Sequence, residues 1–317
     1  MIIPVLDARS ADFPAELCRA SREIGFASVV GHGISTELFE RVRSMLRTLF
    51  ALPDAEKRAV RIEPDNYRGF IPLGFFTPNR AEANGDLGDQ YEGYKLHWEC
   101  PPDHPVAVEC DLYGPNRWPA SLPELAPLVA EYWRACDRAA APMLDAFAGA
   151  LGVSPVEFRS WHDAPLTNMT LLHYPSQPAA SDTLGIHPHK DTNVITLLHP
   201  DPVGGLEVRT SDGAWVEPDA PPDALVVNVG EMLELWSGGD FSATPHRVIN
   251  RTGAERYSFP YFVVPRHDIV VRPVVEPRPG FDHPPMPVGP LSAEVWRTNW
   301  PDESPSTAGY DLGTLDR

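Results

Sequence analysis

The sequence has little positive charge. Its 26 lysine and arginine residues compare with 44 aspartate and glutamate residues, so the formal net charge at pH 7 is −18. Nucleic acids and anionic membrane surfaces are usually bound through basic faces. We therefore expect neither of them as a partner, although a local arginine can still make one pocket attractive to an anionic small molecule.

Cysteine and long apolar runs are also scarce. The four cysteines, Cys18, Cys100, Cys110 and Cys136, lie far apart and lack the close pairs of a metal site, which is typical of reduced thiols. No run of residues is long and apolar enough to span a bilayer. The first residues, "MIIPVLDARS", do not resemble an export signal. We expect a cytoplasmic protein.

The pattern of apolar residues changes near the middle of the chain. The first half contains segments with helical spacing, including one long expected helix over residues 122–152. From about residue 168, short runs of β-branched and apolar residues alternate with turn residues, as in a β-sandwich or barrel. Because no obvious linker separates the halves, we expect one domain over residues 1–317.

Several stretches carry further structural expectations. Residues 63–120 are rich in glycine, proline and aromatic residues, so we expect them to be mostly loop, and a loop of this length is often functional. The stretch "MLELWSGG" (232–239) is counted among the β-type runs. We interpret "SDG" (211–213) and "RTG" (251–253) as hairpin turns.

The densest group of polar residues begins one of the β-type runs, in "GIHPHKDTNVITLL" (185–198). Since residues two apart on a strand share a face, His187, His189 and Asp191 are expected to point one way and Lys190 the other. A histidine and an aspartate at this spacing on the rim of a barrel can reach one divalent metal. Two histidines and one carboxylate form the ligand set of non-haem Fe(II) oxygenases, and a zinc hydrolase can use the same set.

A third histidine and a possible anion clamp follow. His246 begins the run in "SATPHRVIN", and Arg256 and Ser258 share a strand face in "RYSF". A turn centred near Thr252 is expected to place His246 opposite Ser258 on the neighbouring strand. An arginine in such a cavity either holds a ligand carboxylate through two parallel hydrogen bonds or forms a structural pair with an aspartate.

These motifs together resemble the isopenicillin N synthase-like branch of the 2-oxoglutarate/Fe(II)-dependent dioxygenases. The resemblance covers nearly the whole chain, from "IPVLD" and "REIGFASVVGHGI" through "HKDTNVITLL" to "RYSFPYFVVP". It implies a mixed, mainly β fold with a double-stranded β-helix (jelly roll) core and flanking N-terminal helices. The implied parts of this single oxygenase domain are a mainly helical framework in 1–165, a jelly-roll catalytic core in 166–272 and a C-terminal segment near the barrel mouth in 273–317.

The resemblance also implies a ligand set. His189, Asp191 and His246 would bind Fe(II), which leaves room for 2-oxoglutarate and O2 as co-substrates. Oxidative decarboxylation of 2-oxoglutarate would then yield succinate and CO2. The histidine ligands must be neutral, so activity is expected to fall at mildly acidic pH.

A second set of residues would bind the co-substrate. The resemblance implies that Arg256 and Ser258 hold the distal carboxylate of 2-oxoglutarate, and Tyr174 in "LLHYP" matches a family tyrosine that contacts the same group. Many members carry asparagine two residues before that tyrosine, where this chain has Leu172. That difference removes one possible contact to the co-substrate.

The substrate pocket of this family is usually lined by the region before the long helix and by the C-terminus. Here that region contains "NYRGFIPLGFF" (66–76) and "GDQYEGYKLHWE" (88–99). Aromatic residues mixed with arginine and lysine suit a small substrate that carries a carboxylate or a ring. The candidate substrate residues, including His187 of the metal motif, are Tyr67, Arg68, Phe75, Tyr91, Tyr94, Lys95, His97, Trp98 and His187.

The leading hypothesis is a 2-oxoglutarate-dependent oxygenase that hydroxylates, desaturates or cyclises a small metabolite, for example one of secondary metabolism. The first alternative is an Fe(II) oxidase of the same fold that does not use 2-oxoglutarate, because such members keep the arginine and serine for a substrate carboxylate. The second is a cupin-like metal-binding protein. Cupins favour two histidines two apart with a glutamate soon after, and here no glutamate follows His187 and His189 at a suitable spacing. A zinc hydrolase is the third.

Overall fold

β-Strands form the centre of the structure, a computed structural model that describes residues 3–64, 66–75, 88–178 and 183–298, with only the backbone of 296–298. In chain order the described strands are β1 (Val5–Asp7), β2 (Phe26–Val30), β3 (Gly69–Ile71), β4 (Glu92–His97), β5 (Asn168–Tyr174), β6 (Leu184–His189), β7 (Ile195–Leu198), β8 (Leu206–Arg209), β9 (Trp215–Val216), β10 (Leu225–Val229), β11 (His246–Ile249), β12 (Arg256–Ser258), β13 (Tyr261–Val263), β14 (Val270–Val271) and β15 (Met286–Pro287).

These strands form two main sheets and a ribbon. The large sheet has the order β1-β2-β10-β7-β13-β5-β4-β3, and β12 also pairs with β5. The small sheet has the order β6-β11-β8-β9, and β14 pairs with β15. β1 and β2 run parallel, whereas the other paired strands run antiparallel.

Apolar side chains fill the space between the two main sheets. Phe26 and Val226 of the large sheet share one buried cluster with Val208 of the small sheet. At the other end, Tyr174 of the large sheet packs with Val248 of the small sheet. Burial of these side chains on both inner faces holds the sheets against each other.

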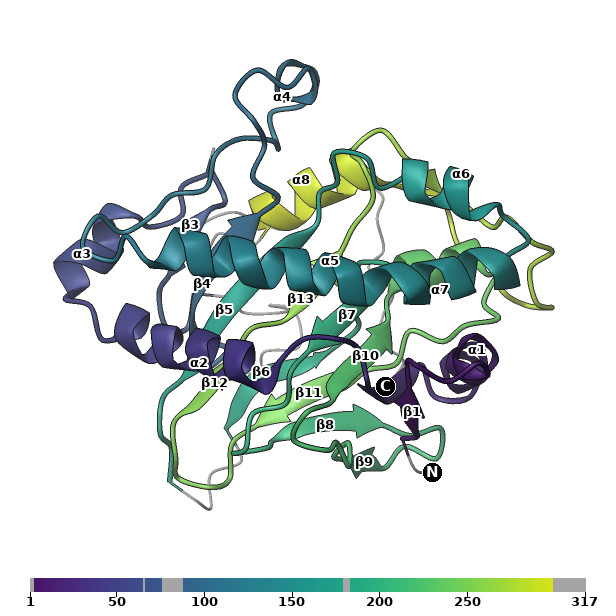
Figure 1. Cartoon of the computed structure of the whole chain (residues 1–317), viewed down its shortest axis with the longest axis horizontal. Helices are drawn as coiled ribbons and strands as arrows, with labels where there is room; N and C mark the ends of the chain where they lie inside the picture. The colour runs from purple at the N-terminus through teal and green to yellow at the C-terminus, as the bar shows by residue number, and fades with distance from the viewer. Residues whose placement is uncertain (1–2, 65, 76–87, 179–182, 299–317) are drawn as a thin grey trace.

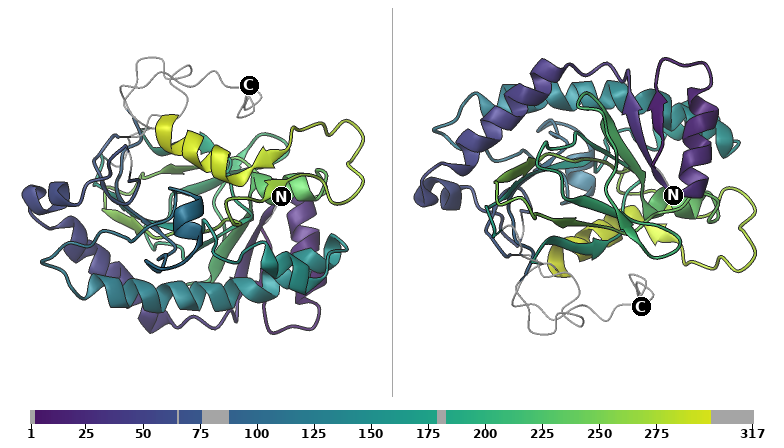
Figure 2. Two further views of the ribbon diagram at one scale, coloured as in Figure 1. Left: turned by 90° about the horizontal axis from the view of Figure 1, so that it is seen from above. Right: turned by 90° about the horizontal axis from the view of Figure 1, so that it is seen from below.

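The helices lie outside the strands. They are α1 (Phe13–Glu23), α2 (Thr36–Phe50), α3 (Asp54–Ala59), α4 (Val106–Glu109), α5 (Leu125–Ala150), α6 (Pro155–Ser160), α7 (Glu231–Trp236) and α8 (Val288–Thr298). Figure 1 shows α5 crossing in front of β4, β5, β13 and β7. In both views of Figure 2, α2 and α5 lie on one side of the strands and α8 lies on the other.

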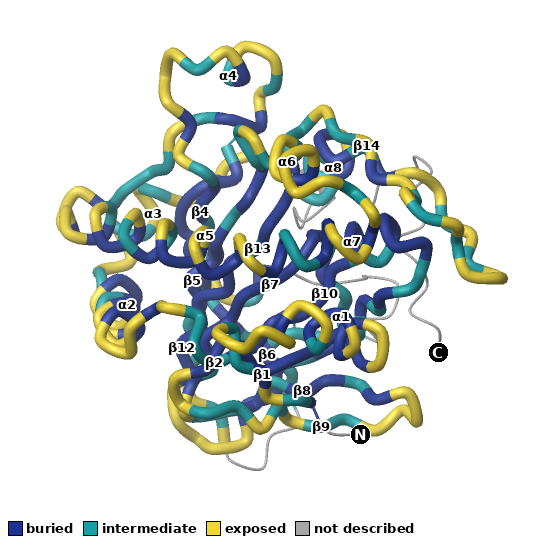
Figure 3. Tube along the Cα trace, turned by 45° about the vertical axis from the view of Figure 1, so that its right-hand side comes forward, coloured by how far each residue is buried: buried dark blue, intermediate teal, exposed yellow. Residues whose placement is uncertain are grey.

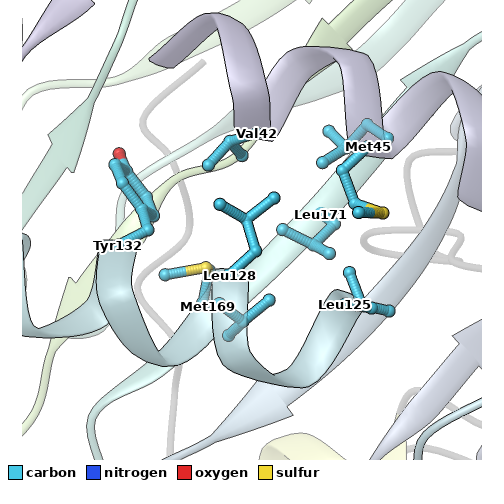
Figure 4. Close-up of a pocket in the computed structure, with 9 residues that line it drawn as sticks. Val42, Met45, Leu125, Leu128, Tyr132, Met169 and Leu171 are labelled. Atoms are coloured by element: carbon cyan, nitrogen blue, oxygen red, sulfur yellow. The ribbon is translucent and has the colours of Figure 1, made fainter. Parts of the chain in front are cut away.

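The contact between α2, α5 and β5 explains why these sequences form helices. Ser35 begins α2 by accepting a hydrogen bond from the Leu38 amide at 3.2 Å, the usual role of an N-cap serine. The apolar stripes of both helices then face β5. Figure 4 shows this layer as a small apolar pocket, lined by Val42, Met45, Leu46, Leu125, Leu128, Val129, Tyr132, Met169 and Leu171. The strands beneath are buried and the outer helix faces are exposed (Figure 3).

One expectation about local structure is confirmed only in part, and another is wrong. Residues 63–120 are mostly loop where the structure describes them, but they also contain β3 and β4, and β4 pairs with β5 over six residues, from Glu92 to His97. β4 is mostly buried on both faces, so its sequence lacks the alternation that marks a half-exposed strand. "MLELWSGG" contributes most of α7, because periodicity does not separate a short apolar helix from a strand.

Two further local expectations have opposite outcomes. The "SDG" hairpin is present, since β8 pairs with β9 and Gly213 has a φ of 85°, which favours glycine. The "RTG" turn joins β11 to β12, which are not hydrogen-bonded to each other. Residues 299–317 lie outside the described residues, so the position of the C-terminal end stays a prediction. Among the helices that are described, none is both long and apolar enough to cross a membrane.

Candidate metal centre and co-substrate site

The two histidines of the metal motif lie directly opposite each other in the small sheet. β6 and β11 are antiparallel neighbours, and His189 and His246 are register partners. β6 ends at His189, so Asp191 lies in the turn that leads to β7. The structure therefore brings the three side chains together, but Asp191 reaches the group through this turn and not through strand alternation.

The three side chains form a compact metal-ligating group. Their ligand atoms all lie within 4.8 Å of one another, and Nε2 of each histidine is 3.6 Å from Oδ1 of Asp191. The imidazole centroids are 4.3 Å apart. The side chain of Asp191 is 7% exposed and that of His246 10%, whereas the side chain of His189 keeps 32%. The group is therefore open on the His189 side.

Backbone carbonyls orient both imidazoles. Nδ1 of His189 lies 2.8 Å from the carbonyl oxygen of His187, and Nδ1 of His246 lies 3.2 Å from that of Thr244. These contacts fit Nδ1 atoms that carry the proton and donate it to the carbonyls. Both Nε2 atoms are then left with lone pairs that face Asp191.

The carboxylate of Asp191 is fixed by two strands of the large sheet. Its Oδ2 accepts hydrogen bonds from Thr196 Oγ1 on β7 (2.5 Å) and from Asn228 Nδ2 on β10 (2.8 Å). Oδ1 is left facing both histidines. Sequence reasoning missed these two supports. The signal was available, since each is a polar residue inside an apolar run, where a buried polar partner is the usual reason for its presence.

The protonation states of this group suit a divalent cation. Burial lowers the pKa of His246 to about 4, and the neighbouring His189 adds to the effect. Burial acts to raise the pKa of Asp191, but the two histidines and the hydrogen bonds from Asn228 and Thr196 outweigh it and hold that pKa below its usual value. At neutral pH, His246 is neutral and Asp191 is ionised, as metal binding requires. Two imidazoles and one carboxylate fit Fe(II).

Arg256 and Ser258 lie on β12 of the large sheet. β12 pairs with β5, where Arg256 is the register partner of Tyr174, whereas β11 pairs with β6 and β8. The expectation that His246 lies opposite Ser258 on a neighbouring strand is therefore wrong. Residues 250–255 carry the chain from the small sheet to the large one, so the two residues belong to facing sheets.

Arg256 is a buried cation. It is 2% exposed, donates from Nε to the Gly204 carbonyl at 2.8 Å, and places its guanidinium carbon 4.7 Å from the centre of the Tyr174 ring. Its Nη1 has no hydrogen-bond partner within the part of the chain that the structure describes. A buried charge needs an anion, and a carboxylate matches a guanidinium through two parallel hydrogen bonds. The residues present therefore fit 2-oxoglutarate.

Leu172 fills the position where many family members carry asparagine. It is 5% exposed and packs with Tyr91, Tyr174 and Val248 between the sheets. The Tyr91 and Tyr174 rings are 5.9 Å apart between centroids. The inner face of β5 beside Arg256 is thus apolar in this chain.

His187 and Lys190 each contact a carboxylate outside the metal group. Nδ1 of His187 lies 2.7 Å from Oδ1 of Asp89, and the His187 amide donates to the same oxygen at 3.0 Å. Lys190 lies 3.2 Å from Glu234 on α7. Lys190 therefore points away from the metal group, and His187 connects β6 to the segment before β4.

Several candidate substrate residues lie away from the metal group. Tyr94 faces the helices and donates its hydroxyl to the Arg117 carbonyl at 2.5 Å. Trp98 packs edge-on against Tyr113. These contacts explain the two aromatic side chains as core and loop packing.

The candidates that precede β4 form a separate small group. Tyr67 and Phe75 pack with Ile62 and Ile71. Arg68 is 3% exposed and donates to the Leu112 carbonyl at 2.7 Å. Burial lowers the pKa of Arg68 to about 10, so its guanidinium stays charged at neutral pH.

Lys95 and His97 lie on the inner face of β4. Their register partners on β5 are Thr170 and Asn168, which alternate with residues that face α2 and α5. Burial lowers the pKa of His97 well below its usual value, so this imidazole is neutral. Together with Tyr91, these are the predicted substrate residues that the structure places between the sheets.

Comparison with known proteins matches this sequence to a family. The model of the 2OG-Fe(II) oxygenase superfamily matches residues 166–265, and that of the N-terminal region of non-haem dioxygenases in morphine synthesis matches residues 3–121. A 2-oxoglutarate-Fe(II) type oxidoreductase of Aspergillus fumigatus is 31% identical over 314 residues, which cover 93% of this chain and 92% of the relative. This chain belongs to the 2-oxoglutarate/Fe(II) oxygenase superfamily.

Other relatives agree with the assignment. Homoarginine-6-hydroxylase 2-ODD-C23.1 of Arabidopsis thaliana is 30% identical over 275 residues, which cover 84% of this chain and 81% of the relative. The crystal structure of JOX2 in complex with 2OG, Fe and JA is 26% identical, with a TM-score of 0.78 over 94% of this chain and 85% of that one. The expected jelly-roll fold with flanking helices and the expected cofactors, Fe(II) and 2-oxoglutarate, are confirmed, and the protein is a dioxygenase.

Proposed function

We propose that His189, Asp191 and His246 hold the Fe(II) of this oxygenase. The observation that carries the proposal is the convergence of two Nε2 atoms and one carboxylate oxygen on a point that is open on one side. Bound iron supplies the O2 chemistry that couples decarboxylation of 2-oxoglutarate to oxidation of a substrate C–H bond. The chain's own part is to keep His246 neutral, to hold Asp191 through Thr196 and Asn228, and to orient the imidazoles.

The proposal places 2-oxoglutarate beside β12. Arg256 and Ser258 would bind its distal carboxylate, with Tyr174 against the guanidinium. The open Nη1 of the buried Arg256 supports this assignment, and so does the absence of a described carboxylate in ion-pair contact with it. Leu172 would form an apolar side of this co-substrate site and would donate no hydrogen bond to 2-oxoglutarate.

The proposed substrate is a small metabolite that carries a carboxylate or a ring. Hydroxylation, desaturation and ring formation are the reactions open to this chemistry. Support comes from relatives, since one is named a homoarginine hydroxylase and the JOX2 crystal contains JA. The cytoplasm is the proposed location, which the four free cysteines support.

Succinate release coupled to O2 uptake tests the proposal. Protein loaded anaerobically with Fe(II) is mixed with 2-oxoglutarate, O2 and a panel of amino acids and small carboxylic acids. We expect one class of compound to stimulate succinate release. His189→Ala should abolish Fe(II) binding and succinate release, whereas His283→Ala, which removes a half-buried imidazole outside the metal group, should retain both.

Two other results would contradict it. O2 uptake without succinate and without dependence on 2-oxoglutarate would identify an oxidase of the same fold. Normal Fe(II) binding by His189→Ala would place the metal elsewhere, as in a cupin-like protein.

A further inference from the structure

Lys95 differs from the other lysines of the chain. The sequence contains three, Lys57, Lys95 and Lys190. Lys57 lies 3.0 Å from Glu92, and Lys190 lies 3.2 Å from Glu234. Lys95 forms no ion pair with any carboxylate of the described residues, and its Nζ donates instead to two neutral oxygens, Asn168 Oδ1 at 2.7 Å and Thr170 Oγ1 at 3.0 Å.

The position of Lys95 relative to the metal group follows from strand register. On the inner face of the large sheet, Thr196 of β7 pairs with Phe262 of β13, and Phe262 pairs with Asn168 of β5. Thr196 holds Asp191, and Asn168 holds Lys95. The Lys95 ammonium lies 5.3 Å from the centre of the Phe262 ring. Phe262 therefore lies between Thr196, which bonds the metal ligand Asp191, and Asn168, which bonds the ammonium of Lys95.

This part of the sheet is in contact with solvent, although it lies inside the molecule. Lys95, Asn168 and Phe262 are half-buried, whereas the outward-facing residues between them, Leu96 and Tyr261, are buried. The remaining exposure is therefore on the side of the small sheet. Burial lowers the pKa of Lys95 to about 7, against the attraction of Asp191, which shows how poorly the site compensates a positive charge.

Arg256, which is proposed to bind 2-oxoglutarate, lies beside a different part of β5 from Lys95. Arg256 pairs with Tyr174, four residues beyond Thr170, where Lys95 is held. Leu172 lies between Thr170 and Tyr174 on β5 and makes this part of the inner face apolar. Two separate basic side chains thus face the space between the sheets, Arg256, which is suited to 2-oxoglutarate, and Lys95, which has no assigned anion.

We propose that Lys95 binds an anionic group of the substrate, with a carboxylate as the simplest case, and thereby determines which substrates are accepted. The body of the substrate lies over Phe262, and its reacting C–H bond is directed toward the metal group. Asn168 and Thr170 position the ammonium. The inference rests on the proposed function, because it assumes an iron site at His189, Asp191 and His246.

A structural role for Lys95 is the competing explanation. In that case the ammonium only connects β4 to β5 through Asn168 and Thr170, and no ligand depends on its charge. Lys95→Met keeps most of the side-chain length and removes the charge, and Lys95→Arg keeps the charge. Lys57→Met is the matched control, since it removes the same charge from a lysine bonded to Glu92 and the Phe50 carbonyl, beside the helices.

The test uses anaerobic calorimetric titration of protein loaded with Fe(II) and saturating 2-oxoglutarate, so that the Arg256 clamp is already occupied. The probes are three acid and amide pairs: benzoate and benzamide, phenylacetate and phenylacetamide, cinnamate and cinnamamide. For at least one pair we expect wild-type protein to bind the acid about 10- to 100-fold more tightly than the amide. Lys95→Met should lose this preference through the acid alone, while Lys95→Arg and Lys57→Met should largely keep it.

The inference is overturned if no acid binds more tightly than its amide, or if Lys95→Met binds the acids as wild-type protein does. Binding of 2-oxoglutarate itself is measured in the same series. Protein that binds 2-oxoglutarate but shows no acid preference contradicts the role of Lys95 alone. Protein that binds no 2-oxoglutarate contradicts the proposed function instead.

Discussion

Among single residues, Arg256 is a buried cation with an incomplete set of hydrogen-bond partners among the described residues. Its side chain is 2% exposed, donates to the Gly204 carbonyl and lies against Tyr174, and its Nη1 has no hydrogen-bond partner among the described residues, so the charge carries a large desolvation cost. Binding of a carboxylate would offset that cost. Arg256 is therefore expected to lower the free energy of unfolding of the protein without 2-oxoglutarate, and to strengthen the binding of 2-oxoglutarate.

Replacing Arg256 by methionine tests this expectation. Loss of one partner from a buried charge pair costs about 2–5 kcal/mol, so the Kd for 2-oxoglutarate should rise by at least about 30-fold. Calorimetric titration of the Fe(II)-loaded protein measures it. Arg22→Met, which removes an exposed ion pair with Asp240, should leave the Kd within about twofold. An unchanged Kd for 2-oxoglutarate in Arg256→Met would show that 2-oxoglutarate does not bind beside Arg256 on β12.

The lowered pKa of Lys95 predicts a pH dependence of stability. Between about pH 7, its pKa in the folded protein, and 10.5, its ordinary value, the unfolded chain holds a proton that the folded protein does not. The contribution of Lys95 to the free energy of unfolding therefore rises with pH through that window, by up to about 1.4 kcal/mol per pH unit. Below the window this contribution does not change with pH. Urea unfolding at pH 6, 7, 8 and 9 should show this slope in wild-type protein relative to Lys95→Met. Parallel profiles would contradict the shift.

At the scale of elements, the metal group depends on both sheets. β6 and β11 of the small sheet supply the histidines, whereas β7 and β10 of the large sheet hold Asp191 through Thr196 and Asn228. The carboxylate lies in a turn, so these two hydrogen bonds decide its direction. Residues that orient a ligand commonly affect metal affinity by 10- to 100-fold.

Thr196→Val isolates this support, because valine keeps the shape of threonine and removes the hydroxyl. We expect the affinity for Fe(II) to fall by about 10- to 100-fold, with a loss of stability of about 1 kcal/mol from the hydrogen bond. Competition with a metal-sensitive dye measures the affinity. Thr48→Val, whose hydroxyl bonds within the exposed face of α2, is the control and should bind Fe(II) normally. Equal affinities in the two variants would show that Asp191 holds its position without β7.

At the scale of the whole molecule, one continuous core joins the helical framework to the sheets. Phe147 of α5 is fully buried, and its ring lies 5.3 Å from that of Phe241, which follows α7 in the C-terminal half. The core cluster that contains both residues also includes side chains of α1, α2 and the large sheet. We therefore predict that residues 1–165 and 166–272 unfold together.

Phe147→Ala tests that prediction. Loss of a fully buried phenylalanine should lower the free energy of unfolding by about 3–5 kcal/mol. If the chain is one cooperative unit, circular dichroism and tryptophan fluorescence should report a single transition, displaced by the same amount. Val156→Ala, at a side chain that is 73% exposed, should change stability by less than about 0.5 kcal/mol. Two separate transitions, with only one displaced, would divide the chain into two domains.

The sequence by itself determined the residue types of the metal group and the faces of single elements. His189, Asp191 and His246 could be named because two-residue spacing and ligand chemistry are local properties. The helix start at Ser35 depends on a local property of the same kind, because its side chain accepts a hydrogen bond from the amide of Leu38, three residues on. The resemblance to family motifs then predicted that Arg256 binds 2-oxoglutarate.

Only the tertiary structure decided which strands meet. Alternation assigns a side chain to one face of a strand but says nothing about the partner strand, since pairing depends on contacts far apart in sequence. That is why the expected pairing of His246 with Ser258 was wrong, and why β4 was taken for loop. The supports of Asp191 at Thr196 and Asn228, and the contacts of Lys95 with Asn168 and Thr170, arise from the same long-range pairing.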